Sequence, residues 1–292
     1  MSPTFLELLK NGPVLVADGA TGTGLQAAGL PAGTLPEEWN LSRPEVIAAL
    51  HRAYLDAGAR IVLTNTFGGN RIKLARAGRA ELAGDTNRRA AEIAVQVAGP
   101  YGALVGGDIG PSGELLEPIG NLTYDEAVSA FAEQVRSLEE GGVDCIWIET
   151  ISDLSEARAA IQGTQQVSSL PIVCTFSFDS HGHTMMGVKP RQAAEALASL
   201  GLAAIGSNCG ANLDDTLQAV KAMAAVLPGM PLVAKPNAGL PRLVGNDSVY
   251  DTAPEEMARY AALYVREGAR IVGGCCGSTP AHITAIAQKV RE

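Results

Sequence analysis

Hydrophobic and polar positions alternate along the chain in a repeated pattern. A short apolar run, mostly β-branched, ends in polar residues or glycine, and an alanine-rich stretch with helical spacing follows it. The apolar runs have the length of buried strands. They lie at 14–17, 61–64, 103–107, 144–149, 172–176, 203–207, 232–235 and 270–274. The pattern therefore predicts eight buried strands.

The segments between these runs are predicted helices. Thr123, with Glu126 three residues later, is a capping-box signature, and Pro254 before two glutamates is typical of a first helical turn. Helices are expected at 44–57, 86–98, 124–140, 153–166, 190–200, 212–227, 254–267 and 279–290. Each predicted strand is thus followed by a helix.

Eight strand-then-helix units over roughly 260 residues favour one closed (β/α)8 barrel, the TIM-barrel type of α/β fold. Two similar sequence segments, at 53–65 and 264–274, each contain the end of a predicted helix, a glycine at which the chain turns, and the start of a predicted strand. No polar linker divides the chain, so we expect a single domain over residues 1–292, with its core at about 14–290. An open, doubly wound sheet is the alternative, but it needs a topological switch point that the sequence does not locate.

Composition narrows the class of protein. Of the 292 residues, 47% are hydrophobic and 18% are charged, which excludes intrinsic disorder. The net charge of −9 repels phosphate backbones, so no nucleic-acid partner is expected. We expect no signal peptide and no membrane segment, because every apolar run is far shorter than the roughly 20 residues that span a bilayer. Five cysteines, an odd number, argue against a disulfide framework and favour a reducing, cytoplasmic location.

Polar residues follow every predicted strand. In chain order these residues are Asp18, Gly19, Thr64, Asn65, Thr66, Asp108, Glu149, Thr150, Ser177, Asn208, Cys209, Asn237, Cys275 and Cys276. A single one of them could simply cap a helix or solvate a loop. Because barrel enzymes build their active sites at the carboxyl ends of the strands, eight converging sets indicate a functional site.

The five cysteines fall into two groups. Cys145 and Cys174 lie inside apolar strands and are predicted to be inert, buried thiols. Cys209, Cys275 and Cys276 follow the sixth and eighth strands, whose ends lie ~10 Å apart in a closed barrel. Three thiolates suit Zn²⁺ in tetrahedral geometry with an open fourth position, as in catalytic zinc sites. A vicinal redox disulfide is the alternative, but the flanking glycines and the third cysteine favour zinc.

These motifs resemble those of the homocysteine S-methyltransferase family. The matching motifs are the opening DGATGT, GDIGPSGE at 107–114, SNCG at 207–210 and GGCCGSTP at 273–280, and the likeness extends from about Val14 to about Ile286. The chain most resembles the homocysteine-binding barrel of cobalamin-dependent methionine synthases. The resemblance implies a zinc-dependent enzyme that transfers a methyl group to the thiol of homocysteine and forms methionine.

The resemblance also implies how the substrate is bound. Asp18 and Glu149 match carboxylates that hold the substrate ammonium group. The backbone at Gly19 and Thr64 matches the donors to the substrate carboxylate. Two anionic acceptors on one side and N–H donors on the other complement a zwitterionic amino acid.

The remaining matched residues surround the metal. Cys209, Cys275 and Cys276 match the family's zinc ligands, and Asn237 matches an asparagine that fills the open position when substrate is absent. Asp108 matches a site residue with a less defined role. A free alkyl thiol is mostly protonated at neutral pH, and coordination to zinc deprotonates it while it keeps a reactive lone pair.

The methyl donor stays open at this point. Nothing in the 292 residues resembles the corrinoid-binding module of the methionine synthases, and Thr150 stands where betaine-using relatives carry an aromatic residue. Trp39 could stack on an onium donor, although a lone loop tryptophan is more often a packing residue. The expected donor is a methyl-corrinoid on a separate protein, or a small onium compound such as S-methylmethionine or a betaine.

Two other classes of function have to be weighed. A non-catalytic barrel that binds zinc or thiols, as a sensor or a subunit, has no use for an amino-acid clamp beside an open zinc position. A phosphate-binding aldolase or isomerase needs a catalytic lysine at a strand end, where Lys235 is the candidate, and a glycine-rich phosphate grip that GGCC does not provide. We therefore predict a methyltransferase with Zn²⁺ as its cofactor and with homocysteine and a methyl donor as its substrates.

Overall fold

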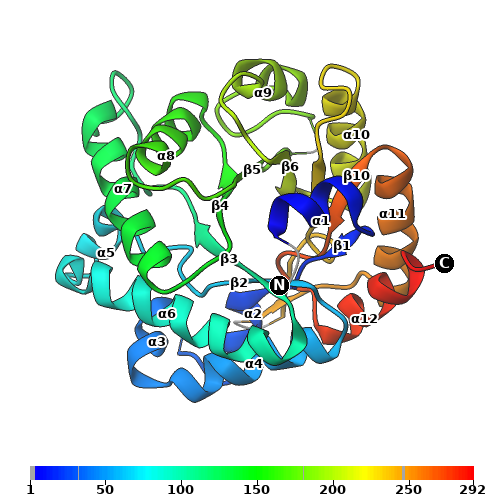
Figure 1. The fold of residues 1–292 in the computed structure, drawn as a ribbon, viewed down its shortest axis with the longest axis horizontal. Helices are drawn as coiled ribbons and strands as arrows, with labels where there is room; N and C mark the ends of the chain where they lie inside the picture. Colours follow the sequence, from blue (N-terminus) through cyan, green and yellow to red (C-terminus); the bar gives the residue numbers. More distant parts are fainter. Residues whose placement is uncertain (1–3, 32, 180, 245–246) are drawn as a thin grey trace.

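The computed structural model describes residues 4–31, 33–179, 181–244 and 247–292. Eight parallel strands form one sheet at the centre of the molecule (Figure 1). They are β1 (Leu15–Val16), β2 (Ile61–Leu63), β3 (Leu104–Ile109), β4 (Cys145–Ile151), β5 (Ile172–Phe176), β6 (Ala204–Cys209), β7 (Leu232–Pro236) and β10 (Ala269–Val272). Each strand overlaps one predicted apolar run, so all eight predictions are confirmed.

The sheet closes on itself. Its strands are hydrogen-bonded in the order β1-β10-β7-β6-β5-β4-β3-β2, and a parallel bridge between Ala17 and Ile61 joins the two ends of this series. Backbone hydrogen bonds from Arg60 N to Val16 O (2.6 Å) and from Asp18 N to Ile61 O (3.0 Å) support the seam. The fold is therefore a single-domain (β/α)8 barrel, and the open-sheet alternative is wrong.

A ring of helices surrounds the barrel, with one long helix after each strand (Figure 1). These helices are α4 (Pro44–Asp56), α6 (Ala83–Ala98), α7 (Tyr124–Glu140), α8 (Leu154–Val167), α9 (Pro190–Leu197), α10 (Leu213–Ala224), α11 (Pro254–Arg266) and α12 (Pro280–Lys289). The predicted capping box is present, because the Thr123 hydroxyl accepts from Glu126 N and the Glu126 carboxylate accepts from Thr123 N at 3.0 Å. The eight helix predictions are confirmed.

The structure also contains shorter elements that hydrophobic periodicity does not predict, since a single turn or a three-residue strand has no period. They are α2 (Thr21–Ala27), α3 (Trp39–Ser42), α5 (Arg71–Ala75), the antiparallel strands β8 (Arg242–Val244) and β9 (Asp247–Val249), and 3-10 turns at Pro36–Glu38, Ala80–Leu82 and Gly99–Tyr101. Except for the turn at Gly99–Tyr101, these elements lie in the connections after β1, β2 and β7, on the side of the barrel where the strands end.

α1 (Phe5–Asn11) closes the amino-terminal end of the barrel. Its capping box pairs Thr4 with Glu7, and its buried residues Phe5 and Leu9 pack on apolar side chains from all eight strands. Those side chains are Leu15, Ile61, Leu63, Leu104, Cys145, Trp147, Val173, Ala204, Val233 and Ile271. Figure 1 shows α1 in front of the strands and inside the ring of helices. The half of the barrel interior toward the amino-terminal ends of the strands, called the lower half below, is therefore a filled core. The half toward the carboxyl ends is called the upper half.

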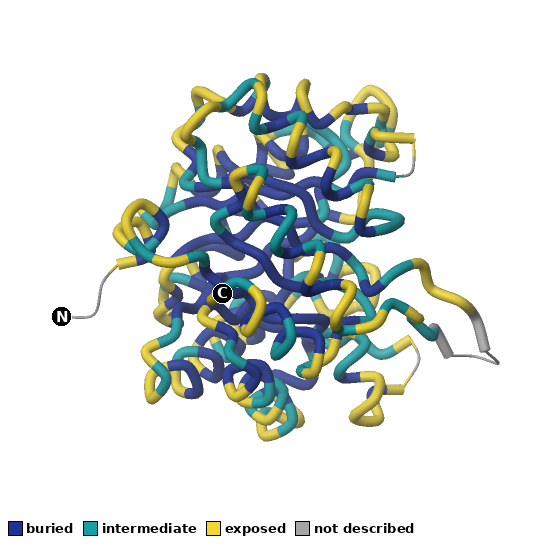
Figure 2. The backbone as a smooth tube through the Cα atoms, turned by 90° about the vertical axis from the view of Figure 1, so that its right-hand side faces the viewer, coloured by how far each residue is buried: buried dark blue, intermediate teal, exposed yellow. Residues whose placement is uncertain are grey.

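Burial follows this architecture. The strands are buried almost throughout, and exposed residues gather on the outer faces of the helices and in the loops (Figure 2). A second, larger apolar cluster fills the layer between strands and helices. In the part of the chain that the structure describes, no helix combines the length and the apolar character that crossing a membrane requires.

Candidate active site

A cavity of about 260 Å³ lies at the carboxyl ends of the strands. Seven of the eight barrel strands, or the loops that follow them, contribute to its wall. Eight of the nine predicted site residues line it, namely Asp18, Gly19, Thr64, Asp108, Glu149, Cys209, Cys275 and Cys276. The ninth, Asn237, lies beside it and donates a hydrogen bond from Nδ2 to Gly210 O at 3.0 Å. Residues that are far apart in the sequence thus meet where the barrel geometry requires.

Three cysteine thiols meet at one side of the cavity. The sulfur atoms of Cys209, Cys275 and Cys276 lie within 4.8 Å of one another, and those of Cys209 and Cys275 are 3.0 Å apart. All five cysteines of the chain are free thiols. Cys209 has a positive φ of 55°, a conformation that non-glycine residues adopt rarely and mostly at functional sites. The end of β6 is therefore bent in a way that turns this thiol toward the other two.

The electrostatics of this three-cysteine cluster favour a bound cation. Hydrogen bonds from Cys209 and then from Cys275 lower the pKa of Cys276 to about 3. The pKa of Cys209 is raised well above its usual value by its hydrogen bonds to Cys275 and Cys276 and by burial. One sulfur thus carries a negative charge while a neighbour keeps its proton, because adjacent thiolates repel each other. A metal ion would allow all three to ionise, and three thiolates are a donor set that Zn²⁺ accepts.

Asn237 fits the same interpretation. Its side-chain Oδ1 is buried and has no hydrogen-bond partner among the described residues. A buried amide oxygen without a partner is unfavourable by roughly 1–3 kcal/mol, so such an atom requires an explanation. The unpartnered Oδ1 is explained if it occupies the open coordination position of a metal held by the three cysteines. This is the role that the resemblance implies for Asn237.

Two carboxylates face the cavity without partners. Asp108 Oδ1 and Glu149 Oε2 are buried and accept no hydrogen bond from any described residue. Burial raises the pKa of Glu149 to about 8, and burial together with the charge of Glu149 raises the pKa of Asp108. A cationic ligand between them would satisfy both groups and keep them ionised. Two buried carboxylates with unpartnered oxygens have the chemistry to bind a cation, such as an ammonium group.

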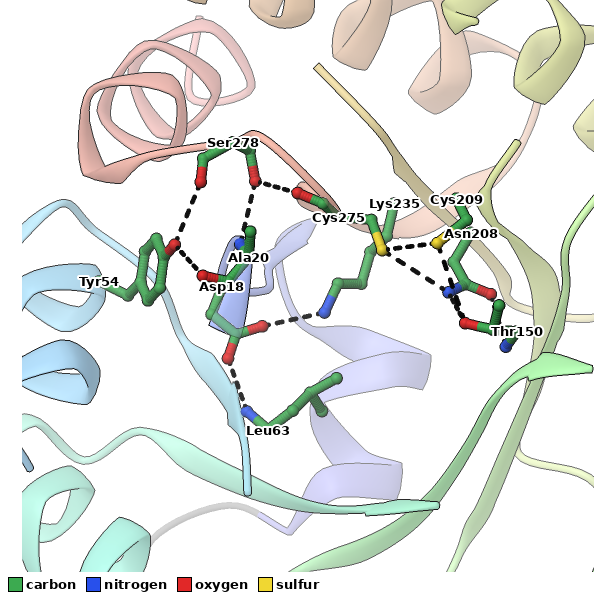
Figure 3. A network of polar contacts seen from close by, with 10 residues as sticks. All are labelled: Asp18, Ala20, Tyr54, Leu63, Thr150, Asn208, Cys209, Lys235, Cys275 and Ser278. Carbon is green, nitrogen blue, oxygen red and sulfur yellow. Dashed lines mark hydrogen bonds and ion pairs between the residues drawn. The ribbon is translucent and has the colours of Figure 1, made fainter. Parts of the chain in front are cut away.

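Asp18 has a different environment. Its Oδ1 accepts a hydrogen bond from Lys235 Nζ at 2.9 Å, and its Oδ2 accepts one from Leu63 N at 2.7 Å (Figure 3). The two side chains of this ion pair are only 2% and 3% exposed. Burial alone would lower the pKa of Lys235, but the negative charges of Asp18 and Glu149 outweigh it and hold the pKa above its usual value. Asp18 thus already binds one cation that belongs to the protein.

The backbone groups that were expected to bind a carboxylate also differ from each other. Gly19 N has no hydrogen-bond partner among the described residues, and a Cβ at this position would lie 2.7 Å from the Tyr54 ring, which explains the glycine. Thr64 N, in contrast, donates to Gly106 O at 3.0 Å within the sheet. The Thr64 hydroxyl accepts from Asp108 N at 2.9 Å. Thr64 therefore positions Asp108, and of these two expected donors only Gly19 N is free to contact a ligand.

Tyr54 and Ser278 hold the first and last strand ends together, a role that was not predicted. The Ser278 hydroxyl accepts from Ala20 N at 3.1 Å and donates to Cys275 O at 2.7 Å (Figure 3). Tyr54 donates to Ala20 O at 2.8 Å. The contact between Ala20 and Ser278 joins residues 258 positions apart, and the sequence carries no local signal for it.

Asn208, on β6, links the ends of β4 and β5 beside the site. Its Oδ1 accepts from Thr150 N at 2.9 Å and from the Thr175 hydroxyl at 2.8 Å, and its Nδ2 donates to the Thr150 hydroxyl at 2.7 Å. Thr150 has a positive φ of 61°, and these hydrogen bonds maintain that conformation. The sequence analysis placed Asn208 among the residues at the strand ends but gave it no role of its own.

Tyr250 is a further residue that the sequence analysis missed. Its ring packs on Gly277, where a Cβ would approach Tyr250 Cγ to 2.1 Å. Its hydroxyl hydrogen-bonds Cys276, which is one reason why the pKa of that thiol is lowered. Trp39, by contrast, is buried in a separate apolar cluster with Leu25 and Ile47, as a packing residue would be.

The fold and the site together define a (β/α)8-barrel protein with a three-cysteine centre beside an acidic cavity. The sequence profile of the homocysteine S-methyltransferase family matches residues 15–290. The chain belongs to this family, which confirms the resemblance found in the motifs.

The chain is similar to two curated relatives. It is 34% identical to the methionine synthases of Mycobacterium tuberculosis and Mycobacterium leprae over 297 residues, a match that covers 95% of this chain and 24% of each relative. The chain thus spans about a quarter of the length of these relatives.

The chain is also similar to a solved enzyme structure. The metallated form of the homocysteine methyltransferase MmuM from Escherichia coli has 25% sequence identity and a TM-score of 0.82, with 98% of both chains covered. The oxidized form of the same protein gives 26% identity and a TM-score of 0.81, also over 98% of both chains.

Proposed function

We propose that this chain catalyses the zinc-dependent transfer of a methyl group to the thiol of homocysteine, which yields methionine. The observation that carries the proposal is the presence of three convergent thiols and two unpartnered carboxylates in one cavity. Family membership and the names of the relatives, a homocysteine methyltransferase and two methionine synthases, support the same activity.

Cys209, Cys275 and Cys276 would hold the zinc ion, and Asn237 Oδ1 would complete its coordination when no substrate is present. When bound, zinc supplies a Lewis-acidic charge that keeps a thiol deprotonated at neutral pH. Tyr250 and Asn208 would support the cysteine cluster, Tyr250 through Cys276 and Asn208 through Cys275, whose Sγ lies 3.9 Å from Asn208 Nδ2.

The protein's own residues bind and orient the amino acid. Asp18 and Glu149, with Asp108 beside them in the cavity wall, would accept hydrogen bonds from the ammonium group, and Gly19 N would donate to the carboxylate. With the amino acid held by these carboxylates, its sulfur could reach the three cysteines, which line the same cavity. The S–CH3 bond then forms as the bond between methyl and donor breaks, and the donor leaves with that electron pair. Holding sulfur and methyl in line is the main contribution of such a site.

The donor is a methyl-corrinoid on a separate protein or a small onium compound, S-methylmethionine or a betaine. The chain itself is expected to be colourless when purified, because none of its segments resembles a corrinoid module. We also expect it to act in the cytoplasm, where its thiols stay reduced.

A donor screen tests the proposal. Zinc-loaded protein is incubated with homocysteine and, separately, with methylcobalamin, S-methylmethionine or glycine betaine, and methionine is measured by mass spectrometry. Methionine from one donor, lost after chelation and restored by zinc, supports the proposal and names the donor class. Binding of zinc and homocysteine without turnover on any donor would favour the non-catalytic alternative. Failure to bind either ligand would overturn both.

A further inference from the structure

A second hollow lies at the opposite end of the barrel from the three-cysteine cluster. It is a groove of about 780 Å³ beside α1, at the point where β6, β7 and β10 begin (Figure 1). None of the described residues that line it also lines the cavity at the carboxyl ends of the strands. Small-molecule sites have volumes of roughly 300–1,000 Å³. The groove is therefore large enough for a ligand of its own.

The lining of this groove is mostly apolar. α1 contributes Leu6, which is 52% exposed because the helix buries Phe5 and Leu9 on the barrel. The end of α10 and the turn after it contribute Leu227 and Met230, which are both half-buried. An apolar chain that lies in the groove would remove this apolar surface from water, which favours binding.

Two cations also line the groove. Lys10 follows Leu6 by four residues and therefore lies on the same side of α1. Arg270 Nε donates to Leu9 O at 3.2 Å and its Nη2 donates to Gly12 O, whereas its Nη1 has no partner among the described residues. Neither cation forms an ion pair with a described carboxylate. Both therefore have N–H donors available for an anion.

The charge of the groove is opposite to that of the chain as a whole. The chain has a net charge of −9, yet no described residue of the lining is an aspartate or a glutamate. Glu267 precedes Gly268 of the lining, but its Oε1 pairs with Lys221 at 3.8 Å. A cationic ligand would meet charges of its own sign here, and a neutral ligand would leave both cations unpaired. The groove thus complements an anion that carries an apolar chain.

We propose that this groove binds a medium-chain carboxylate. The carboxylate group accepts hydrogen bonds from Lys10 Nζ and Arg270 Nη1, and the apolar chain lies against Leu6, Leu227 and Met230. The site is separate from the proposed methyl transfer, because it uses no residue of the cavity at the carboxyl ends.

Three ligands with the same eight-carbon chain separate the effect of the charge from that of the chain. Octanoate is an anion at pH 7, octan-1-ol is neutral and octylammonium is a cation. Titration calorimetry with the full-length chain, below the concentrations at which these ligands form micelles, measures their dissociation constants. Octanoate should bind roughly tenfold more tightly than octanol, as for a hydrogen bond to a charged group, and octylammonium should bind most weakly. An excess of homocysteine should leave the affinity for octanoate unchanged.

Two variants at exposed positions distinguish the roles of the lining. Lys10→Gln should weaken octanoate by roughly two- to fivefold and leave octanol unchanged, because an exposed charge contributes modestly. Leu6→Ala should weaken both ligands by a similar factor, roughly three- to tenfold, because it removes apolar lining. Lys189→Gln and Leu240→Ala are the matched controls, since they change an exposed lysine and an exposed leucine at the other end of the barrel. Neither control should alter the binding of octanoate or octanol.

Several results would overturn the proposal. They are an absence of octanoate binding, equal affinities for octanoate and octanol, and displacement of octanoate by homocysteine, which would place it in the cavity at the carboxyl ends. Binding to phosphatidylglycerol vesicles without binding of monomeric octanoate would indicate a membrane surface instead. If a second copy of the chain covers the groove, the unaltered protein should sediment as a dimer and Leu6→Ala as a monomer, without octanoate binding to the dimer.

Discussion

The two halves of the barrel interior use the same eight strands for opposite purposes. Toward the amino-terminal end the interior is filled by apolar side chains and closed by α1. Toward the carboxyl end the strands present carboxylates, thiols and a lysine around a cavity, and three buried polar atoms there have no partner among the described residues. Packing accounts for most of the first half, where Trp147 Nε1 is also buried without a partner among the described residues. The second half is explained only by ligands that complete it.

The cysteines make the same comparison within one residue type. Cys145 and Cys174 are fully buried in strands, and burial raises the pKa of Cys174 to about 12. Cys209 and Cys276 lie at strand ends, where contacts between thiols lower one pKa and raise the other. The surroundings of each cysteine therefore separate the thiols packed in apolar clusters from the strand-end thiols that could hold a metal.

Removal of a thiol from the upper half should have the largest effect. Cys276→Ala leaves two sulfur donors, so the bound zinc should be lost. Methyl transfer should fall by more than about two orders of magnitude, because removing even a residue that only hydrogen-bonds a metal ligand lowers metal affinity or activity 10- to 100-fold. Elemental analysis of freshly purified protein should find about one zinc per unaltered chain and far less in the variant. A variant that retains full zinc occupancy would contradict the metal site.

A cavity in the lower half should affect stability and leave the site intact. Ile271 is fully buried in β10, four residues before Cys275. Ile271→Ala should lower the free energy of unfolding by about 2–5 kcal/mol, and Ile271→Val by only about 0.5–1.5 kcal/mol. Urea denaturation measures both. Zinc affinity should not change in either variant; a parallel loss of metal would mean that the two halves are not independent.

The ammonium acceptor should give a smaller effect, confined to the ligand. Glu149→Gln keeps the shape of the side chain but replaces a charge-assisted hydrogen bond, worth roughly 1.5–3 kcal/mol, by a neutral one. Homocysteine affinity should fall by roughly 10- to 100-fold with zinc content unchanged. Unaltered affinity, measured by calorimetry, would show that Glu149 serves the fold alone.

The lower half and the strand ends could be predicted from the sequence because their signals are local. Every apolar run became a strand, and the residue after each run faces the same end of the barrel, so Cys209 and Cys275 had to converge. α1 was missed although Thr4 and Glu7 form a capping box, since the helix is only seven residues long. A short helix gives too few turns for a hydrophobic period to be recognised.

What could not be predicted depends on partners that are distant in the chain. Lys235 and Asp18 are separated by 217 positions, and the pairing of their charges follows from side-chain directions in the closed barrel. The same holds for Tyr54 and Ser278, which are 224 positions apart. The assignment of Thr64 N as a ligand donor also required the sheet register, which places Gly106 O against it. Spacing identifies which residues meet, but hydrogen-bond partners decide which of them remain free.

The smallest effect is expected for the buried thiols, and it is the sharpest test of the comparison. Cys174→Ala removes one sulfur atom from a packed strand and should cost about 1 kcal/mol of stability, comparable to the loss of a buried methyl group, with zinc binding unaffected.

Chemical labelling tests the same buried thiols. The thiolate is the reactive species, and a pKa of about 12 leaves almost none of the Cys174 thiolate at pH 8. Iodoacetamide followed by mass spectrometry should therefore leave Cys174 and Cys145 unmodified in the folded protein. In metal-free protein the same reagent should label Cys276, whose pKa is about 3. Labelling of Cys145 before unfolding would show that the interior closed by α1 opens to solvent, and labelling of Cys174 that the layer between strands and helices does. Either result would contradict the division between a closed core and reactive strand ends.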